Sequence, residues 1–229
     1  MNIIVIGGTR GIGKEIVIRL SHNIDNQIIV TGRNEKALEH LSSYSDNIHA
    51  LRLDLASKNT DYELLLRGIK SHFISVDVLI NNAGLLISKG FSEIDEKDAR
   101  MMMETNFFGP SMVIKKLKPL MSEGSHIVNI TSMGGFQGSS KFKGMAYYSA
   151  SKAAFACLSE CLAGEFAESG ISVNCLAMGA VQTEMLEEAF PGYKAPLTAK
   201  EMAEFISYFA VNGHKYFNGK VLPVAVSTP

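Results

Sequence analysis

Short runs of apolar, mostly β-branched residues alternate along the chain with longer segments of helical character. The strand-like runs cover residues 2–6, 27–31, 48–53, 76–80, 126–130, 171–176 and 220–224. Several of these runs are apolar throughout, which is typical of strands buried on both faces. The alternation predicts right-handed crossovers. We therefore expect an α/β fold of three layers around a doubly wound, seven-stranded parallel sheet.

Two long helices are predicted in the second half of the chain, over residues 98–121 and 145–168. The second segment is rich in alanine and has no proline, which favours an uninterrupted helix. Cys157 and Cys161 stand four residues apart on it, where we expect them to be small core side chains.

Two helix starts are marked by capping-box spacing. Thr60 is followed by Glu63 and Thr198 by Glu201, so we expect a helix to begin after each threonine. No internal repeat, low-complexity tract or linker interrupts the pattern, and 229 residues suit one large domain better than two small ones.

Composition narrows the class of protein. The net charge is −1 with acidic and basic residues interspersed, which favours neither a nucleic acid nor a membrane surface as partner. The three cysteines lack metal-site spacing, and the chain has no apolar run of about 18 residues. The first strand begins at Asn2 without a basic leader. We expect a protein of the reducing cytoplasm that holds no metal.

The turn after the first strand has the sequence Gly-Gly-Thr-Arg-Gly-Ile-Gly and leads into an amphipathic helix. Free backbone N–H groups and the helix dipole favour an anion there, and glycines let a pyrophosphate approach the backbone. The alternative is a plain tight turn. The phosphate-binding candidates are Gly7, Thr9, Arg10, Gly11, Ile12 and Gly13.

The end of the second strand carries Arg33 and Asn34 and lacks the acidic residue that usually accepts from the ribose 2′-OH of NAD. Arg33 and Arg10 could together bind a 2′-phosphate, because a guanidinium pairs well with phosphate oxygens. We therefore predict NADP(H) as the cofactor. Two ordinary surface arginines are the alternative, and a bend of the loop could bring Glu35 to the ribose instead.

Further candidates stand at the carboxyl ends of the third and fourth strands, the edge where open α/β sheets bind ligands. Asp54, beside Leu55, could accept a hydrogen bond from an adenine amino group. Asn82, Ala83 and Gly84 could bring the backbone close to the cofactor. By themselves such residues are also ordinary turn formers.

Tyr148 and Lys152 are four residues apart and share a helix face. A free phenol has a pKa of about 10, and lowering it to about 7 requires roughly 4 kcal/mol of preferential stabilisation of the phenolate. A lysine cation nearby would contribute to that. The pair is a weak signal alone, but Ser132 follows the fifth strand and Asn106 lies in the helical segment before it.

Residues 1–226 resemble the short-chain dehydrogenase/reductase family in its compact, single-domain form, which has a Rossmann fold. Gly7, Gly11 and Gly13 match its glycine motif, residues 81–84 match its Asn-Asn-Ala-Gly, and the catalytic tetrad matches Asn106, Ser132, Tyr148 and Lys152. The resemblance implies an NADP(H)-dependent oxidoreductase that moves a hydride between nicotinamide and a carbonyl or alcohol.

The resemblance also implies a role for each residue. Tyr148 gives a proton to the carbonyl oxygen or takes it from the alcohol, and Ser132 holds that oxygen. Lys152 binds the nicotinamide ribose and favours the phenolate, and Asn106 holds a backbone carbonyl and a water of a proton relay. Gly179, Val181 and Thr183 match the segment that contacts the nicotinamide carboxamide.

Several features depart from the family pattern. Met178 replaces the usual proline before Gly179, and the loop 133–147 is enlarged. The lid segment, residues 183–198, is short, and residues 224–229 lack the common glycine-rich end. We expect the substrate-pocket walls to come from residues 84–90, 133–147 and 183–198. Lys141 and Lys143 could attract an anionic substrate there, although a solvated loop is the interpretation we favour.

Assembly and two other functions stay open. The resemblance implies that helices 98–121 and 145–168 pair with their copies in a homodimer or homotetramer. The alternative is that their spare apolar side chains, Met101, Met102, Met103, Phe107, Phe108, Phe155 and Leu158, all face the sheet. The fold could also serve a non-catalytic NADP(H) sensor, or an epimerase or dehydratase that uses transient hydride transfer.

Overall fold

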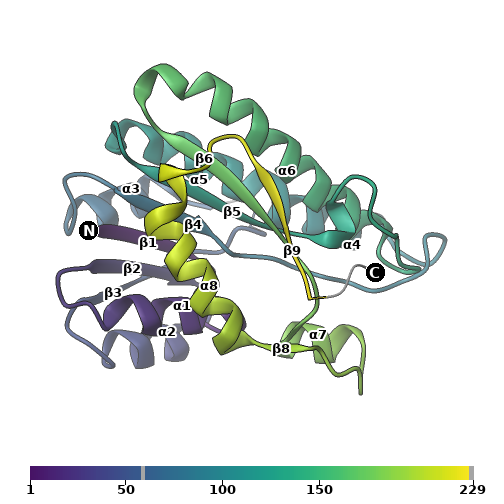
Figure 1. Cartoon of the computed structure of the whole chain (residues 1–229). Helices are drawn as coiled ribbons and strands as arrows, with labels where there is room; N and C mark the ends of the chain where they lie inside the picture. Colours follow the sequence, from purple (N-terminus) through teal and green to yellow (C-terminus); the bar gives the residue numbers. More distant parts are fainter. Residues whose placement is uncertain (58–59, 227–229) are drawn as a thin grey trace.

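Seven parallel strands form one sheet in the order β3-β2-β1-β4-β5-β6-β9, as the computed structural model shows (Figure 1). The structure describes residues 1–57 and 60–226, so part of the expected departure at 224–229 lies outside the described residues. The strands are β1 (Asn2–Ile6), β2 (Gln27–Gly32), β3 (Ile48–Arg52), β4 (Val78–Asn81), β5 (His126–Ser132), β6 (Ser172–Met178) and β9 (Val221–Val224).

Helices cover both faces of the sheet. One face carries α1 (Gly11–Ser21), α2 (Glu35–Ser42) and α8 (Ala199–Asn212), and the other carries α3 (Tyr62–Lys70), α5 (Gly109–Leu117) and α6 (Ala146–Glu165). Successive residues of a strand point to opposite faces. Ile3 and Val5 of β1 therefore pack in one core, whereas Ile4 and Ile6 pack in the other. The predicted three-layer, doubly wound α/β fold is confirmed.

The predicted helix over residues 98–121 is a chain of shorter elements. It comprises α4 (Glu96–Met103), the π-helical turn η1 (Glu104–Phe108), α5, and the 3-10 turn η2 (Lys118–Leu120). π-Helical turns are rare in proteins, and those that do occur are often found at functional sites. This one contains Asn106, which is fully buried.

Of the two predicted capping boxes, the one at Thr198 and Glu201 is confirmed. The other is wrong: α3 is capped by Asp61, whose carboxylate accepts from the Leu64 N–H at 2.8 Å. The Thr60 hydroxyl donates to backbone carbonyls of the preceding loop instead.

The expectation that Cys157 and Cys161 are core side chains is also wrong, because both are exposed. Helix α6 packs on the sheet through the face that carries Phe155, Ser159 and Ala163. With 3.6 residues per turn, Cys157 and Cys161 lie on the other face of the helix.

The lid segment contains structure that the sequence pattern did not predict. Strand β7 (Val181–Gln182) pairs in parallel with β8 (Leu197–Thr198), and the short helix α7 (Glu184–Ala189) lies between them. Figure 1 shows α7 beside the carboxyl end of β9. The direction of the strand order reverses between the neighbouring strands β1 and β4. In folds of this kind, a ligand-binding crevice lies at the carboxyl ends of the strands at that point.

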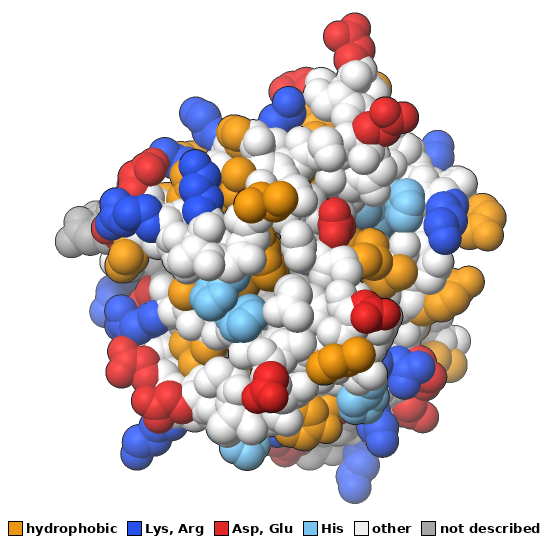
Figure 2. All heavy atoms as spheres, turned by 90° about the vertical axis from the view of Figure 1, so that its left-hand side faces the viewer, with side chains coloured by type: hydrophobic (Ala, Val, Ile, Leu, Met, Phe, Trp, Pro, Cys, Tyr) orange, Lys and Arg blue, Asp and Glu red, His pale blue; other side chains and the backbone are white. Residues whose placement is uncertain are grey.

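None of the described helices is long and apolar enough to cross a membrane. On the face of the molecule seen in Figure 2, acidic and basic side chains are mixed, without a broad field of one sign.

Candidate active site

A cleft of about 620 Å³ lies along the carboxyl ends of the strands. Its lining comes from the loops after β1 to β6 together with α6 and the lid segment. This volume is in the range of small-molecule and cofactor sites.

The glycine turn forms the floor of one end of the cleft. Gly7 has φ +81°, and a Cβ there would lie 2.5 Å from the Ala83 Cα, so the turn needs glycine to pack against the segment after β4. Gly13 faces away from the cleft lining, and a Cβ on it would lie 2.2 Å from the Gly7 carbonyl oxygen. Gly13 therefore serves close packing of α1.

The first turn of α1 faces the cleft. Thr9, Arg10, Gly11 and Ile12 all line it, and the positive end of the helix dipole favours an anion there. The Arg10 guanidinium, however, pairs with the Glu188 carboxylate of α7 at 2.8 Å. This ion pair links the glycine turn to the lid segment.

The loop after β2 presents Arg33 to the cleft. Asn34 lies outside the lining, because its side chain caps α2 by accepting from the Ala37 N–H at 3.0 Å. Glu35 pairs with Arg52 at 3.1 Å. Glu35, the alternative candidate for binding the ribose of NAD, is thus paired with Arg52 at the end of β3.

The loops after β3 and β4 supply the remaining predicted cofactor contacts. Asp54, Leu55, Asn82, Ala83 and Gly84 all line the cleft. One Asp54 carboxylate oxygen accepts from the Ala56 N–H at 3.0 Å. The Asn82 side chain donates to the Gly7 carbonyl at 2.7 Å and so joins the two loops that flank the crevice.

Tyr148 and Ser132 meet in the cleft although they belong to α6 and the end of β5. Burial raises the pKa of the Tyr148 phenol, and a hydrogen bond shared with the Ser132 hydroxyl opposes that shift. The phenol is therefore protonated at neutral pH and can donate a proton in the direction of reduction.

Lys152 lies one helical turn beyond the tyrosine, with its Nζ 6.0 Å from the centre of the Tyr148 ring. The ammonium group donates to the Ile130 carbonyl at 3.0 Å. Burial lowers the pKa of Lys152 to about 8. The lysine is therefore mainly a cation at neutral pH, but it loses its proton at a lower pH than a surface lysine does.

Asn106 lies behind the cleft lining rather than in it. Its side-chain oxygen accepts from the Leu85 N–H at 2.7 Å, and its amide donates to the Leu85 carbonyl at 2.9 Å and to the Ser151 hydroxyl at 2.9 Å. Ser151 in turn donates to the Tyr148 carbonyl. Asn106 thereby ties the loop after β4 to the helix that carries the tyrosine.

Two buried hydroxyls in the cleft were missed by the sequence reasoning. Thr31 and Thr105 are among the residues that line it, and their buried hydroxyl oxygens have no hydrogen-bond partner among the described residues. Unpaired buried polar atoms are uncommon in folded proteins. The first turn of α1, whose residues line the cleft, is the part of it that fits a phosphate-bearing ligand such as a dinucleotide. Pairing of these hydroxyls depends on packing, so no local signal marks them.

The far end of the cleft also draws on residues that the motifs did not mark. Gly179, Val181 and Thr183 line it as expected, and Thr183 also caps α7 by accepting from the Leu186 N–H at 3.3 Å. The additional wall residues, all apolar or aromatic, are Leu86, Phe142, Met145, Met178, Met185, Leu186, Phe190 and Tyr193. All of them except Met178, the last residue of β6, fall within the three segments predicted as pocket walls.

Comparison with known proteins agrees with this geometry. A model of the short chain dehydrogenase family matches residues 1–194. An uncharacterised oxidoreductase of Staphylococcus saprophyticus is 32% identical over 212 residues, which span 90% of this chain and 88% of that protein. The 3-oxoacyl-[acyl-carrier-protein] reductase of Haemophilus influenzae is 32% identical over 234 residues, spanning 96% and 95%.

Solved structures show the same fold. A short-chain dehydrogenase/reductase from Serratia marcescens has a TM-score of 0.86 at 28% identity, covering 97% of this chain and 95% of that one. A short chain dehydrogenase from Burkholderia cenocepacia, solved in complex with NADP, has a TM-score of 0.84 at 22% identity with the same coverage. From the family match, the two relatives and the arrangement of the cleft, the chain belongs to the short-chain dehydrogenase/reductase family of oxidoreductases.

Proposed function

We propose that this protein interconverts a small-molecule carbonyl compound and its alcohol with NADP(H), and that Tyr148 is the proton donor and acceptor. The observation that carries the proposal is that the buried Tyr148 lines the same cleft as Ser132 and the glycine turn, with the Ser132 hydroxyl close enough to influence the phenol. A dinucleotide laid from the turn toward Thr183 would bring its reactive end beside that pair.

The bound nicotinamide would supply or accept the hydride. In reduction, the Tyr148 hydroxyl donates its proton to the carbonyl oxygen as negative charge develops there, and Ser132 stabilises that charge with a hydrogen bond. In oxidation the Tyr148 phenolate would accept the alcohol proton; because burial favours the neutral phenol, the site as it stands favours reduction. Lys152 holds a positive charge beneath the phenol, and Asn106 positions the loop that begins at Gly84.

The proton-donor role predicts that Tyr148→Phe keeps NADPH binding and loses most turnover, because general acid catalysis is worth roughly 10²–10⁴-fold. We would measure initial rates of NADPH oxidation with a panel of aldehydes and ketones, and NADPH affinity by fluorescence titration. Tyr147→Phe is the matched control, since Tyr147 stacks on Phe91 and lies outside the cleft lining. A Tyr148→Phe enzyme within a few-fold of the parent would refute the assignment.

The choice of NADP(H) rests on charge. Arg33 and Arg10 stand at the end of the cleft where the adenosine ribose would lie, and Glu35 is paired with Arg52. Each charge-assisted hydrogen bond to a 2′-phosphate contributes about 1.5–3 kcal/mol. A protein of the same fold binds NADP, in the solved Burkholderia cenocepacia complex.

Two such bonds predict a preference for NADPH over NADH of at least about a hundred-fold in kcat/KM. Arg33→Ala should remove about half of that preference in free-energy terms. Gly32→Asp should shift it toward NADH, although its Cβ would lie 2.4 Å from Thr9 Cγ2 and so requires the Thr9 side chain to move. Steady-state rates with both cofactors test this. Equal affinity of the parent enzyme for NADH and NADPH would contradict the arginine argument, and Glu35 would then be the residue to change.

A further inference from the structure

The charged side chains of the cleft gather at the end assigned to the cofactor. The described charged residues that line it are Arg10, Arg33, Asp54, Lys152 and Glu184. The first three stand on the loops after β1, β2 and β3. Glu184 and its neighbour Thr183 lie against the glycine turn, because a Cβ built on Gly11 would be 3.4 Å from Glu184 Oε2 and 3.4 Å from Thr183 Cγ2. The Lys152 ammonium group donates a hydrogen bond to the Ile130 carbonyl.

The opposite end of the cleft, beyond Tyr148, is apolar. Leu86, Met145 and Phe190 come from three separate segments and pack with Tyr148 in one cluster. Leu186 continues this wall, and Phe142 and Tyr193, which are 48% and 51% exposed, line the cleft next to solvent. A substrate whose carbonyl oxygen reaches Tyr148 must therefore place its other groups among aliphatic, thioether and aromatic side chains.

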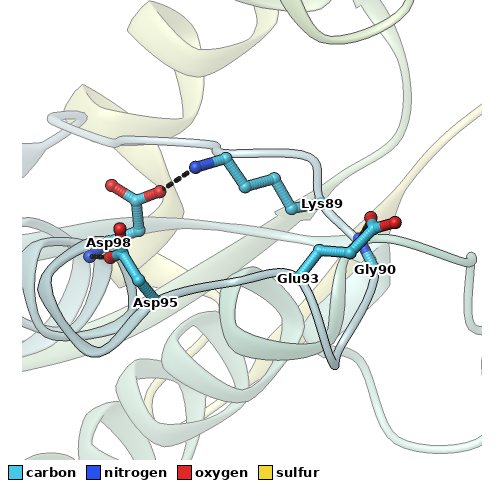
Figure 3. Close-up of polar contacts among 5 residues, drawn as sticks. All are labelled: Lys89, Gly90, Glu93, Asp95 and Asp98. Carbon is cyan, nitrogen blue, oxygen red and sulfur yellow. Dashed lines mark hydrogen bonds and ion pairs between the residues drawn. The ribbon is translucent and has the colours of Figure 1, made fainter.

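The basic side chains of the wall loops, Lys89, Lys141, Lys143 and Lys194, are all absent from the cleft lining. In Figure 3, the Lys89 ammonium group points to the Asp98 carboxylate, and the Glu93 carboxylate accepts from the Gly90 N–H. The Lys141 ammonium group donates to the Phe136 carbonyl at 2.7 Å. No described basic side chain of these loops therefore faces a bound substrate. This agrees with the expectation of a solvated loop.

Resting on the proposed carbonyl chemistry, we infer that the substrate is an uncharged carbonyl compound bearing an aromatic or branched alkyl group. A carboxylate or phosphate held against this apolar wall would lose part of its hydration without gaining a charged partner from the wall, which is unfavourable. The flexible side chains of Met145 and Met185 can adapt to the shape of a ligand. We therefore expect this end of the cleft to select substrates by their polarity more than by their shape.

The inference is tested with two aldehydes of nearly the same size, methyl 4-formylbenzoate and 4-formylbenzoate. With saturating NADPH at pH 7, we expect kcat/KM for the ester to exceed that for the carboxylate by at least about 100-fold. Equal or faster reduction of the carboxylate would overturn the inference while leaving the proposed carbonyl reduction in place.

A charge placed in the wall sharpens the test. Leu186→Arg should raise kcat/KM for the carboxylate and lower it for the ester, so that their ratio narrows by at least about tenfold. Ile74→Arg adds the same charge at a site that is 93% exposed and outside the cleft lining, and should leave the ratio unchanged. An unchanged ratio in a folded Leu186→Arg enzyme counts against the inference.

Failure of the proposed function is distinguished by binding. If neither aldehyde is reduced, the dissociation constants of the two corresponding benzyl alcohols for the enzyme with NADP⁺ are measured by calorimetry. Tighter binding of the ester alcohol by about tenfold or more supports the apolar site, even though the reaction has not been found. Equal or tighter binding of the carboxylate alcohol overturns it.

Discussion

Lys152 is a buried cation whose charge is held only weakly. Because burial lowers its pKa to about 8, the cation is present below that pH and is lost as the pH rises above it. The Tyr148 phenol has a raised pKa and stays protonated over the same range. A change of activity near pH 8 therefore belongs to the lysine and not to the tyrosine.

We predict that kcat/KM for NADPH is nearly level from pH 7 to about pH 8 and falls by about tenfold per pH unit above it, since this parameter reports the free enzyme. NADPH affinity, measured by fluorescence, should follow the same curve. Lys152→Arg keeps its charge to high pH and should lower the rate overall but remove the inflection. A parent profile that stays level to pH 10 would show that the charge of Lys152 is not needed.

Helix α7 brings two carboxylates to the anion-binding end of the cleft. Glu188 holds Arg10, and Glu184 lies against Gly11. A 2′-phosphate on Arg10 must compete with Glu188 for the same guanidinium. On the proposed binding of NADP(H), the lid segment and the cofactor would be coupled through Arg10.

This coupling predicts that Glu188→Gln lowers the Kd for NADPH by about 2- to 5-fold, because an exposed ion pair is worth up to about 1 kcal/mol. The Kd for NADH, which lacks the 2′-phosphate, should change less. Glu204→Gln is a close control: the Arg19–Glu204 pair has almost the same length and exposure as Arg10–Glu188 but lies away from the cleft. An equal change in the Kd for NADPH from both variants would contradict the proposal that Arg10 contacts the 2′-phosphate.

The helices expected to form subunit contacts keep part of their apolar surface exposed. Phe155 and Met102 are buried against the rest of the chain, whereas Phe108 is 49% exposed. The interpretation that all these side chains face the sheet is therefore wrong for Phe108. Exposed aromatic side chains are enriched where subunits meet.

We predict a homodimer or homotetramer, so light scattering at micromolar concentration should give twice or four times the 24.9 kDa of one chain. Phe108→Glu should lower that mass by placing a charge in the contact. Ile74→Glu, at a fully exposed position elsewhere, should not. A monomeric parent would contradict this prediction.

Much of the fold and of the cofactor end of the site follows from short-range patterns in the sequence. Seven apolar runs alternating with helices are enough to predict the parallel sheet, because a parallel connection requires a crossover helix. The carboxyl ends of parallel strands share one edge. Turn residues such as Gly7, Asp54, Asn82 and Ser132 are therefore brought together whatever the loops do.

Other properties depend on how distant segments pack. Arg10 meets Glu188 across 178 residues of chain, and Asn34 turns to cap α2 while its neighbour Arg33 enters the cleft. The outward face of Cys157, the unpaired hydroxyls of Thr31 and Thr105, and the apolar wall beyond Tyr148 also have no signal in the local sequence pattern. Hydrophobic periodicity shows that a helix has a buried face. Which residues lie on that face, and which charged side chains are paired with one another, is determined by contacts between elements.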